Sequence, residues 1–342
     1  MKKEINLSPI ISLKSTFTLM LAPPGWGKTT LILNIYEEFN GKIVFISPLK
    51  ALACEFFKRA SHLKGVYSLS SNDSKEDAKK LFIESKKAML VLTAEKLSDD
   101  IIARSSDENI LFIFDEFHLF YYWGQSFRPI LFEKLMAAAN NSAQMLGLTA
   151  TMDPALLETW KNDFNLAVEN MYLLNLGNQK LLNIPTKIYN FSLLSKMVFY
   201  RYFFREVFFN DQAKTILFFC RYRRDVEMWL DFSKRRNLNA IGCVGGAVED
   251  FIRDLEENPS PRCIFSTSAL SHGVNLPTIT QVFIDYPVDN KDFWIQMVGR
   301  GGRDGTSFQV FEQEKKSWSS IGNLYHSMLL FIKDLFLLRQ NL

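Results

Sequence analysis

The chain has 342 residues, 47% of them hydrophobic and 23% charged, which is ordinary for a globular protein of about two domains. Its 40 basic and 37 acidic residues leave a net charge of only +3, so any contact with nucleic acid must come from a local groove and not from bulk charge. The four cysteines form no C-x-x-C pair, so we expect neither zinc nor disulfides, and their scatter favours the cytoplasm. No apolar run of about 18 residues occurs, so we expect no membrane partner.

Short apolar runs alternate with helix-length segments through the first half of the chain. The predicted buried strands are Phe17–Leu21, Lys42–Ser47, Met89–Leu92, Ile110–Phe114 and Met145–Thr149. The clearest helical spacing between them covers Thr30–Phe39 and Lys50–His62. This alternation predicts an α/β fold with a parallel sheet and helices on both faces.

The same pattern restarts in the second half. Further strands are predicted at Thr215–Cys220, Ala240–Val244, Cys263–Ser266 and Gln281–Asp285, with helices at Asp225–Arg236 and Asp292–Val298. Gly177, Asn178 and Pro185 interrupt the pattern, which places the join near Leu176–Thr186. We therefore expect one lobe at residues 1–182, a second at 183–320 and a C-terminal helix at 321–342.

The sequence A-P-P-G-W-G-K-T at residues 22–29 follows a predicted strand and opens a predicted helix. In this context glycines let backbone N–H groups turn toward phosphate oxygens, Lys28 reaches the β- and γ-phosphates, and the Thr29 hydroxyl binds Mg²⁺. A chance turn is the alternative, which the flanking strand and helix disfavour. The expected ATP-binding residues here are Pro24, Gly25, Trp26, Gly27, Lys28, Thr29 and Thr30.

An apolar strand then ends in D-E-F-H at residues 115–118. Asp115 is expected to hold Mg²⁺ together with Thr29, and Glu116 to orient and deprotonate the attacking water. An exposed acidic pair at a strand end is the alternative interpretation. The hydroxyls of Thr149 and Thr151 end the next predicted strand, where they can relay hydrogen bonds from the ATP site.

The sequence Q-M-V-G-R-G-G-R at residues 296–303 is the clearest pattern in the second half. Arg300 and Arg303 are three residues apart, so we expect them on one helical face, pointing at a phosphate. An arginine in that position stabilises the transition state of phosphoryl transfer. With Gln296 they are the catalytic candidates of this half, and a basic surface loop is the alternative.

In this order the patterns resemble motifs I, II, III and VI of superfamily-two helicases. Segments 47–52, 93–97 and 265–275 are similar to motifs Ia, Ib and V. The resemblance implies two tandem RecA-like lobes that bind ATP and Mg²⁺, with Gly273 and Asn275 also near the nucleotide. It implies sequence-independent contacts to nucleic-acid phosphates from Pro48, Lys50, Thr93 and Thr267.

Within that superfamily, the sequence W-G-Q-S-F-R-P at residues 123–129 resembles the aromatic-rich loop of RecQ helicases, which senses single-stranded DNA. F-F-C-R-Y-R at residues 218–223 and G-R-G-G-R-D-G at residues 299–305 also resemble RecQ segments. The resemblance implies 3′-to-5′ movement on DNA. It adds the nucleic-acid contacts Trp123, Phe127, Arg128 and Arg223. Core packing is the alternative for Tyr121, Tyr122, Trp123 and Phe127.

The chain also departs from RecQ proteins. No Gln precedes Ala22, Gln125 and Ser126 replace a His and an Asp in the aromatic-rich loop, and the zinc-binding, winged-helix and HRDC domains are not expected after Gly305. The segment between Pro277 and Gln296 is too short for a long wedge hairpin. We therefore expect a weak unwinder of single-stranded or partly duplex DNA, with a protein partner supplying substrate choice. An RNA-dependent ATPase, a non-catalytic binding module and a subunit of a larger complex remain alternatives.

Overall fold

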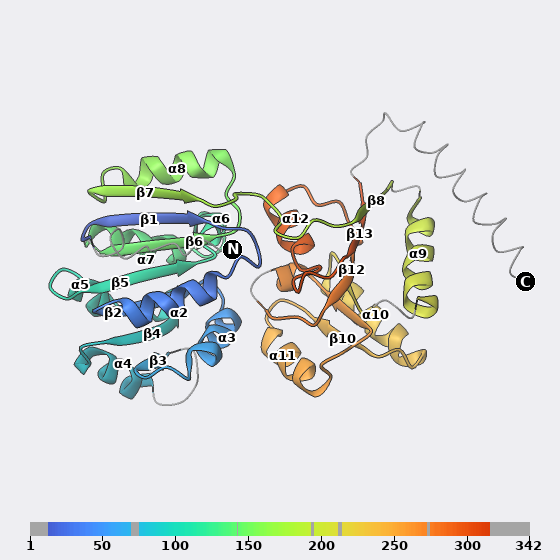
Figure 1. The fold of residues 1–342 in the computed structure, drawn as a ribbon, viewed down its shortest axis with the longest axis horizontal. Helices are drawn as coiled ribbons and strands as arrows, with labels where there is room; N and C mark the ends of the chain where they lie inside the picture. The colour runs from blue at the N-terminus through green and yellow to red at the C-terminus, as the bar shows by residue number, and fades with distance from the viewer. Residues whose placement is uncertain are drawn as a thin grey trace, which may run out of the picture. The chain divides into compact units, whose positions relative to one another are not determined.

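A computed structural model describes residues 13–69, 75–141, 143–192, 195–210, 214–271 and 274–314. The chain divides into two compact lobes, of which lobe 1 ends at Leu182 and lobe 2 begins at Asn183 (Figure 1). The predicted C-terminal helix and Gly273 lie outside the described residues. Among those residues no helix combines the length and apolar character needed to cross a membrane.

Lobe 1 is built on a seven-stranded sheet in the order β3-β4-β2-β5-β6-β1-β7, in which all neighbouring strands are parallel. Its strands are β1 (Thr16–Leu21), β2 (Lys42–Ser47), β3 (Val66–Ser68), β4 (Ala88–Thr93), β5 (Ile110–Asp115), β6 (Gln144–Thr149) and β7 (Asn170–Asn175). Its helices are α2 (Lys28–Glu38), α3 (Lys50–Ala60), α4 (Lys75–Glu84), the 3₁₀ turn η1 (Ala94–Lys96), α5 (Asp99–Arg104), α6 (His118–Tyr122), α7 (Ile130–Asn140) and α8 (Pro154–Phe164).

Helices cover both faces of this sheet because successive strand residues point to opposite sides. In β1, Leu19 and Leu21 pack in one core cluster, whereas Met20 packs in the other. The first cluster includes Trp160 of α8, and the second includes Ile32 of α2. The predicted α/β class is thus confirmed for this lobe. The carboxyl ends of β5, β6 and β1, which are neighbours in the sheet, meet at one edge.

Lobe 2 has a six-stranded parallel sheet in the order β10-β11-β9-β12-β13-β8. Its strands are β8 (Lys187–Phe191), β9 (Thr215–Phe219), β10 (Ala240–Cys243), β11 (Cys263–Ser266), β12 (Ile279–Ile284) and β13 (Gln309–Gln313). Its helices are α9 (Lys196–Phe209), α10 (Arg223–Arg235), α11 (Val248–Glu257), the 3₁₀ turn η3 (Ser268–Ser271) and α12 (Lys291–Val298).

Aromatic side chains dominate one face of the lobe 2 sheet. Phe203 of α9 meets Phe218 of β9 edge to face, with ring centroids 4.7 Å apart. Phe283 of β12 stacks on Phe311 of β13 at 4.3 Å, and Trp229 of α10 closes the same cluster. Figure 1 shows α9 on one side of these strands and α12 on the other. Many of the 30 phenylalanines therefore serve the core.

Candidate active site

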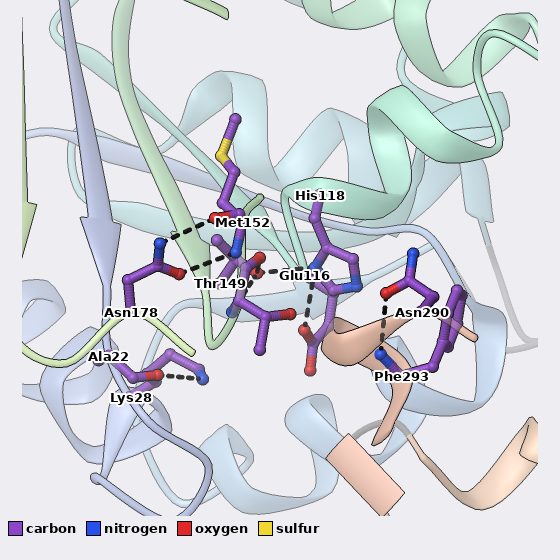
Figure 2. Close-up of polar contacts among 10 residues, drawn as sticks. Ala22, Lys28, Glu116, His118, Thr149, Met152, Asn178, Asn290 and Phe293 are labelled. Atoms are coloured by element: carbon purple, nitrogen blue, oxygen red, sulfur yellow. Dashed lines mark hydrogen bonds and ion pairs between the residues drawn. The ribbon is translucent and has the colours of Figure 1, made fainter. Parts of the chain in front are cut away.

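The phosphate loop lies where the sequence predicts it, between buried β1 and the start of α2. Gly25 and Gly27 have φ angles of 79° and 105°, a conformation that glycine adopts at little cost. Gly27 is also the N-cap of α2 and has no side chain, so at this position the first helical N–H groups are left open to an anion. Lys28 Nζ donates to the Ala22 carbonyl at 3.2 Å across the loop (Figure 2). The local geometry is that of a phosphate cradle.

The other residues predicted for this loop differ in exposure. Pro24 and Trp26 are half-buried, and Trp26 packs against the core beneath α2. Thr29 is half-buried and Thr30 exposed in the first turn of that helix. The loop is joined to the end of β6, because the Ala22 N–H donates to the Thr149 carbonyl at 2.9 Å.

The acidic pair ends β5 at the same edge of the sheet. Burial, together with the charge of Glu116, raises the pKa of Asp115 to about 7, and the Lys28 ammonium acts in the opposite direction. Glu116 is buried and has a φ of 47°, in the left-handed region that a non-glycine residue adopts at a cost. The turn that holds it is fixed by a bond from the Phe117 N–H to the Leu148 carbonyl at 2.9 Å.

The donor set fits a magnesium ion. The Thr29 hydroxyl and the Asp115 carboxylate offer the hard oxygen ligands that Mg²⁺ prefers. The raised pKa of Asp115 marks a carboxylate pair whose negative charge a divalent cation would offset. No group of three or more His, Cys, Asp or Glu side chains gathers into a metal site in the described part of the chain. The remaining ligands would therefore come from phosphate oxygens and water.

Next to Glu116, a row of hydrogen bonds begins at buried His118 and runs through Thr149. His118 Nδ1 lies 3.7 Å from Glu116 Oε2 and 2.7 Å from Thr149 Oγ1 (Figure 2). The Thr149 hydroxyl donates its one proton to the Thr151 carbonyl at 2.9 Å. His118 must then be the donor to Thr149, because a hydroxyl has a single proton. This assigns the proton to Nδ1. At Thr151 the bond is made by the backbone carbonyl, so the relay through both threonine hydroxyls stays a prediction.

Lobe 2 holds Gln296, Arg300 and Arg303 differently from the prediction. Helix α12 ends at Val298, so both arginines lie in the turn beyond it. Arg300 is fully buried and donates to the Val274 carbonyl at 2.6 Å, whereas Arg303 is exposed. The expectation that they share a helical face is therefore wrong. The cause is the G-R-G-G-R sequence, since Gly299 is the C-cap of the helix and Gly302, with a φ of 58°, turns the chain.

The glycines of this turn also have a packing role. A Cβ on Gly301 would lie 2.1 Å from the Phe308 ring, and one on Gly302 would lie 2.4 Å from the Thr306 carbonyl oxygen. Close approach to Phe308 thus explains why glycine occupies both positions. Gln296 is buried inside α12, whose N-terminus is capped by Asn290 through bonds from the N–H groups of Asp292 and Phe293 (Figure 2).

The nucleic-acid candidates of lobe 1 are brought together by Arg128. Its guanidinium donates to the Pro48 carbonyl at 2.6 Å, is hydrogen-bonded to Glu95, and lies 5.8 Å from the Trp123 ring. Burial alone would raise the pKa of Glu95, but the hydrogen bond from Arg128 contributes to a net lowering. Arg128 therefore joins three predicted motifs, a role that the sequence did not indicate.

The remaining lobe 1 candidates differ in exposure. Phe127 is 65% exposed and its ring lies 5.6 Å from that of half-buried Trp123, whereas Tyr121 is fully buried in the core. Core packing thus accounts for Tyr121 but not for Phe127. Lys50 is exposed at the start of α3, and Thr93 is buried at the end of β4.

In lobe 2, Arg223 and Thr267 follow β9 and β11, which are neighbours in the sheet. Arg223 is exposed at the start of α10 and is hydrogen-bonded to the Gly245 carbonyl. Thr267 is half-buried, and Asn275 is exposed. Exposed Tyr222 has arginines on both sides, with the guanidinium carbons of Arg221 and Arg224 at 5.4 and 5.1 Å from its ring. The RecQ-like segment at residues 218–223 includes this group except Arg224, but Arg223 was its only predicted nucleic-acid contact, and Arg221, Tyr222 and Arg224 were not named.

Family models match both lobes. The DEAD/DEAH box helicase model matches residues 7–159, and the helicase conserved C-terminal domain model matches residues 198–305. The ATP-dependent DNA helicase Hel308 of Pyrococcus horikoshii is 31% identical over 163 residues, which are 44% of this chain and 22% of that protein. Helicase 7 of Sulfolobus islandicus filamentous virus is 25% identical over 323 residues, which are 84% of this chain and 50% of that protein. The chain thus spans half or less of the length of these relatives.

Solved structures agree with the fold. Mss116 bound to single-stranded RNA has a TM-score of 0.69 at 15% identity, covering 90% of this chain and 68% of that one. The helicase Lhr of Mycobacterium smegmatis has a TM-score of 0.59 at 18% identity. The match covers 87% of this chain and 44% of the Lhr chain. These likenesses confirm the predicted tandem RecA-like lobes. The chain carries the core of a superfamily-two helicase, made of a DEAD/DEAH box helicase domain followed by a helicase conserved C-terminal domain.

Proposed function

We propose that this chain is an ATP-driven motor that moves on or remodels nucleic acid and is stimulated by single-stranded DNA. The observation that carries the proposal is the edge of the lobe 1 sheet. There the phosphate loop, the Asp115–Glu116 pair and Thr149 stand at the ends of three neighbouring strands. A phosphate cradle beside a carboxylate pair is the arrangement that nucleoside triphosphate hydrolysis requires.

In lobe 1, each group has a distinct part in hydrolysis. The amides at the start of α2 and the Lys28 ammonium bind the phosphates, and Thr29 and Asp115 hold Mg²⁺, which neutralises charge on the β- and γ-phosphates. Glu116 orients the attacking water and accepts its proton. His118 donates through Nδ1 to Thr149, and the same atom lies 3.7 Å from Glu116 Oε2, so the ring connects the surroundings of the carboxylate with the end of β6.

In lobe 2, we assign different parts to the two arginines. Arg303 is exposed and can reach a phosphate, so it is the candidate that stabilises transition-state charge. Buried Arg300 is bonded to Val274, so it shapes the turn that presents Arg303. Gln296 and Asn275 stay candidates for contact with nucleotide or water.

Nucleic acid would bind to phosphate-contacting groups and to exposed aromatic rings. Pro48, Lys50, Thr93 and Thr267 are the candidates for phosphate contact, and Arg223 adds a positive charge. Exposed Phe127 offers a ring on which an unpaired base can stack, supported by Trp123 beneath it. Arg128 would position this loop through its bonds to Pro48 and Glu95.

DNA is favoured over RNA by two observations. The relative from Pyrococcus horikoshii is named a DNA helicase, and the loop at residues 123–129 resembles the RecQ loop that senses single-stranded DNA. The RecQ-like features, 3′-to-5′ polarity included, belong to this proposal. Only Asp285–Asn290 separates β12 from α12, so this connection holds no wedge hairpin and we expect weak unwinding by the chain alone.

The test is steady-state ATP hydrolysis by the purified chain without nucleic acid and with single-stranded DNA, single-stranded RNA or duplex DNA. We expect the strongest stimulation with single-stranded DNA, and loss of turnover in Glu116→Gln. Preferential stimulation by RNA would replace the DNA assignment with an RNA remodeller. Processive strand displacement by the chain alone would contradict the weak-unwinder proposal. If the chain hydrolyses no ATP with any of these nucleic acids, the proposal of an ATP-driven motor is contradicted.

A further inference from the structure

The connector between the lobes begins with a tight turn. β7 ends at Asn175, whose Oδ1 accepts from the N–H groups of Gly177 and Asn178 at 3.1 and 2.9 Å. Gly177 has a φ of 143°, and Gln179, which is not a glycine, has a φ of 54°. A left-handed non-glycine residue persists only where its surroundings hold it, so this start of the connector is a fixed element.

The Asn178 side chain joins this turn to the end of the threonine row. Its Nδ2 donates to the Met152 carbonyl at 2.8 Å, and its Oδ1 accepts from the Met152 N–H at 2.9 Å (Figure 2). The amide thus uses a donor and an acceptor on one backbone residue, much as a neighbouring strand would. Met152 is fully buried and directly follows Thr151, so the connector is tied to the hydrogen bonds that lead back to His118, whose Nδ1 lies 3.7 Å from Glu116 Oε2.

The phosphate loop contacts the same connector. A Cβ on Gly177 would lie 3.0 Å from Pro23 Cγ, and one on Gly25 would lie 3.6 Å from a Leu182 methyl group. The connector therefore packs against the phosphate loop at both ends of the stretch from Gly177 to Leu182. The contact at Gly177 is buried and tight, so a shift of Pro23 would be felt there, whereas the contact between Gly25 and exposed Leu182 is an ordinary van der Waals one.

The far end of the connector is bonded within lobe 2 to the arginine turn. Asn183 Nδ2 donates to the carbonyl of Gly302, which lies between Arg300 and Arg303. The N–H and the hydroxyl of Thr186 both donate to the Phe308 carbonyl, at 2.8 and 2.9 Å. Only the four residues from Gln179 to Leu182 separate the two asparagines.

We propose that residues 175–186 form a coupling strap, in which Asn178 and Asn183 are positioning residues that link the Glu116 site to the turn carrying Arg303. A short segment bonded at both ends passes on a displacement that a loose linker would absorb. Nucleotide that favours one arrangement of the His118–Thr149 row would then favour one arrangement of the strap, through the differential contacts that coupling requires. The inference rests on the proposed function, because it assigns the strap a part in the same ATP cycle.

Three changes test the strap. Asn178→Ala removes the bonds to Met152, and Asn183→Ala removes the bond to Gly302. Insertion of Gly-Ser-Gly-Ser after Lys180 keeps both asparagines but lengthens the segment between them. Asn258→Ala is the matched control, because it removes a side-chain amide pair with Asn239 elsewhere in lobe 2.

The readouts are hydrogen–deuterium exchange of the peptide covering residues 298–305, with and without Mg²⁺ and a non-hydrolysable ATP analogue, and ATP turnover with single-stranded DNA. In the parent and in Asn258→Ala, we expect the analogue to slow exchange at the arginine turn. In the three strap variants this response is lost and stimulated kcat falls about five- to tenfold, the size of an ordinary coupling energy, while KM for ATP changes less than about twofold.

The two proposals fail in different ways. An insertion that leaves both the exchange response and stimulated kcat at parent values would overturn the strap. The strap would also be overturned if Asn258→Ala lost as much of the exchange response and of stimulated kcat as the strap variants do, and if all these variants had lowered melting temperatures. That result would indicate a structural effect only. A parent chain without stimulated turnover would instead contradict the proposed function. The exchange response would then still decide whether nucleotide is linked to the arginine turn through the strap.

Discussion

The two lobes share a parallel-sheet architecture but hold their candidate site residues differently. In lobe 1, Lys28, Glu116 and Thr149 stand at neighbouring strand ends and are joined to nearby groups by short contacts. In lobe 2, Arg300 is buried in its own lobe and Arg303 is exposed. The proposed function accordingly assigns most of the hydrolytic site to lobe 1 and one cation, on a glycine-rich turn, to lobe 2.

The sharpest way to test this contrast is to remove the exposed cation. Arg303→Ala should lower stimulated ATP turnover roughly 10³-fold or more, because an arginine that stabilises phosphoryl-transfer charge contributes about 10³ to 10⁵. Arg303→Lys should recover little, since it lacks the planar fork. Steady-state kinetics measures this, with exposed Arg253→Ala as control. A loss of less than about threefold would remove Arg303 from the catalytic set.

The next largest effect should come from lobe 1. Glu116→Gln should lower turnover roughly 10²- to 10⁴-fold, because the amide cannot accept the proton of water. Binding of the ATP analogue should stay within a few fold of the parent, as measured by fluorescence titration. If nucleotide binding falls as far as turnover, Glu116 serves the fold of the site and not the chemistry.

Arg300 should behave as a structural residue. Arg300→Ala removes a buried guanidinium and leaves the Val274 carbonyl without that bond, which should cost roughly 2–4 kcal/mol of unfolding free energy. Arg303→Ala should change the free energy of unfolding by less than about 0.5 kcal/mol. Urea unfolding followed by tryptophan fluorescence compares the two. Equal stabilities would contradict the contrast between the arginines.

Salt tests the contacts to nucleic acid. If a single strand neutralises roughly four of its phosphates on the chain, its affinity should fall about 50-fold between about 50 and 200 mM salt. Fluorescence anisotropy of a labelled oligonucleotide gives this slope. A nearly constant affinity would rule out binding through phosphates.

The smallest effect concerns the aromatic-rich loop. Phe127→Ala should weaken binding of single-stranded DNA about fivefold and leave stability unchanged, because the ring is exposed. Arg128→Ala should lower both the affinity for single-stranded DNA and the stability, since Arg128 is hydrogen-bonded to Pro48 and Glu95. Anisotropy and thermal unfolding distinguish them. Unchanged binding in Phe127→Ala would remove the stacking role.

Much of lobe 1 could be predicted from sequence because its central strands are continuous apolar runs that end in chemical groups. The strand before Asp115 was predicted to end at Phe114, and β5 ends one residue later. The edge strands β7 and β8 were not among the predicted strands. Most of their residues are half-buried or exposed, β8 has no continuous apolar run, and the apolar run of β7 is only the four residues Met171–Leu174.

The organisation around the arginines and the connector could not be predicted in the same way. A helical face was inferred for Arg300 and Arg303 from spacing alone, but packing of Gly301 against Phe308 places them in a turn. The partners of Asn178 and Asn183 lie 26 and 119 residues away in sequence, so only the folded chain brings them together.

The central claim is that lobe 1 drives a nucleic-acid-stimulated ATPase. The most direct measurement compares ATP turnover of the parent and of Lys28→Ala, each with and without single-stranded DNA. The account predicts strong stimulation of the parent and no turnover above background in Lys28→Ala. Turnover that survives in Lys28→Ala, or a parent that single-stranded DNA does not stimulate, would contradict it.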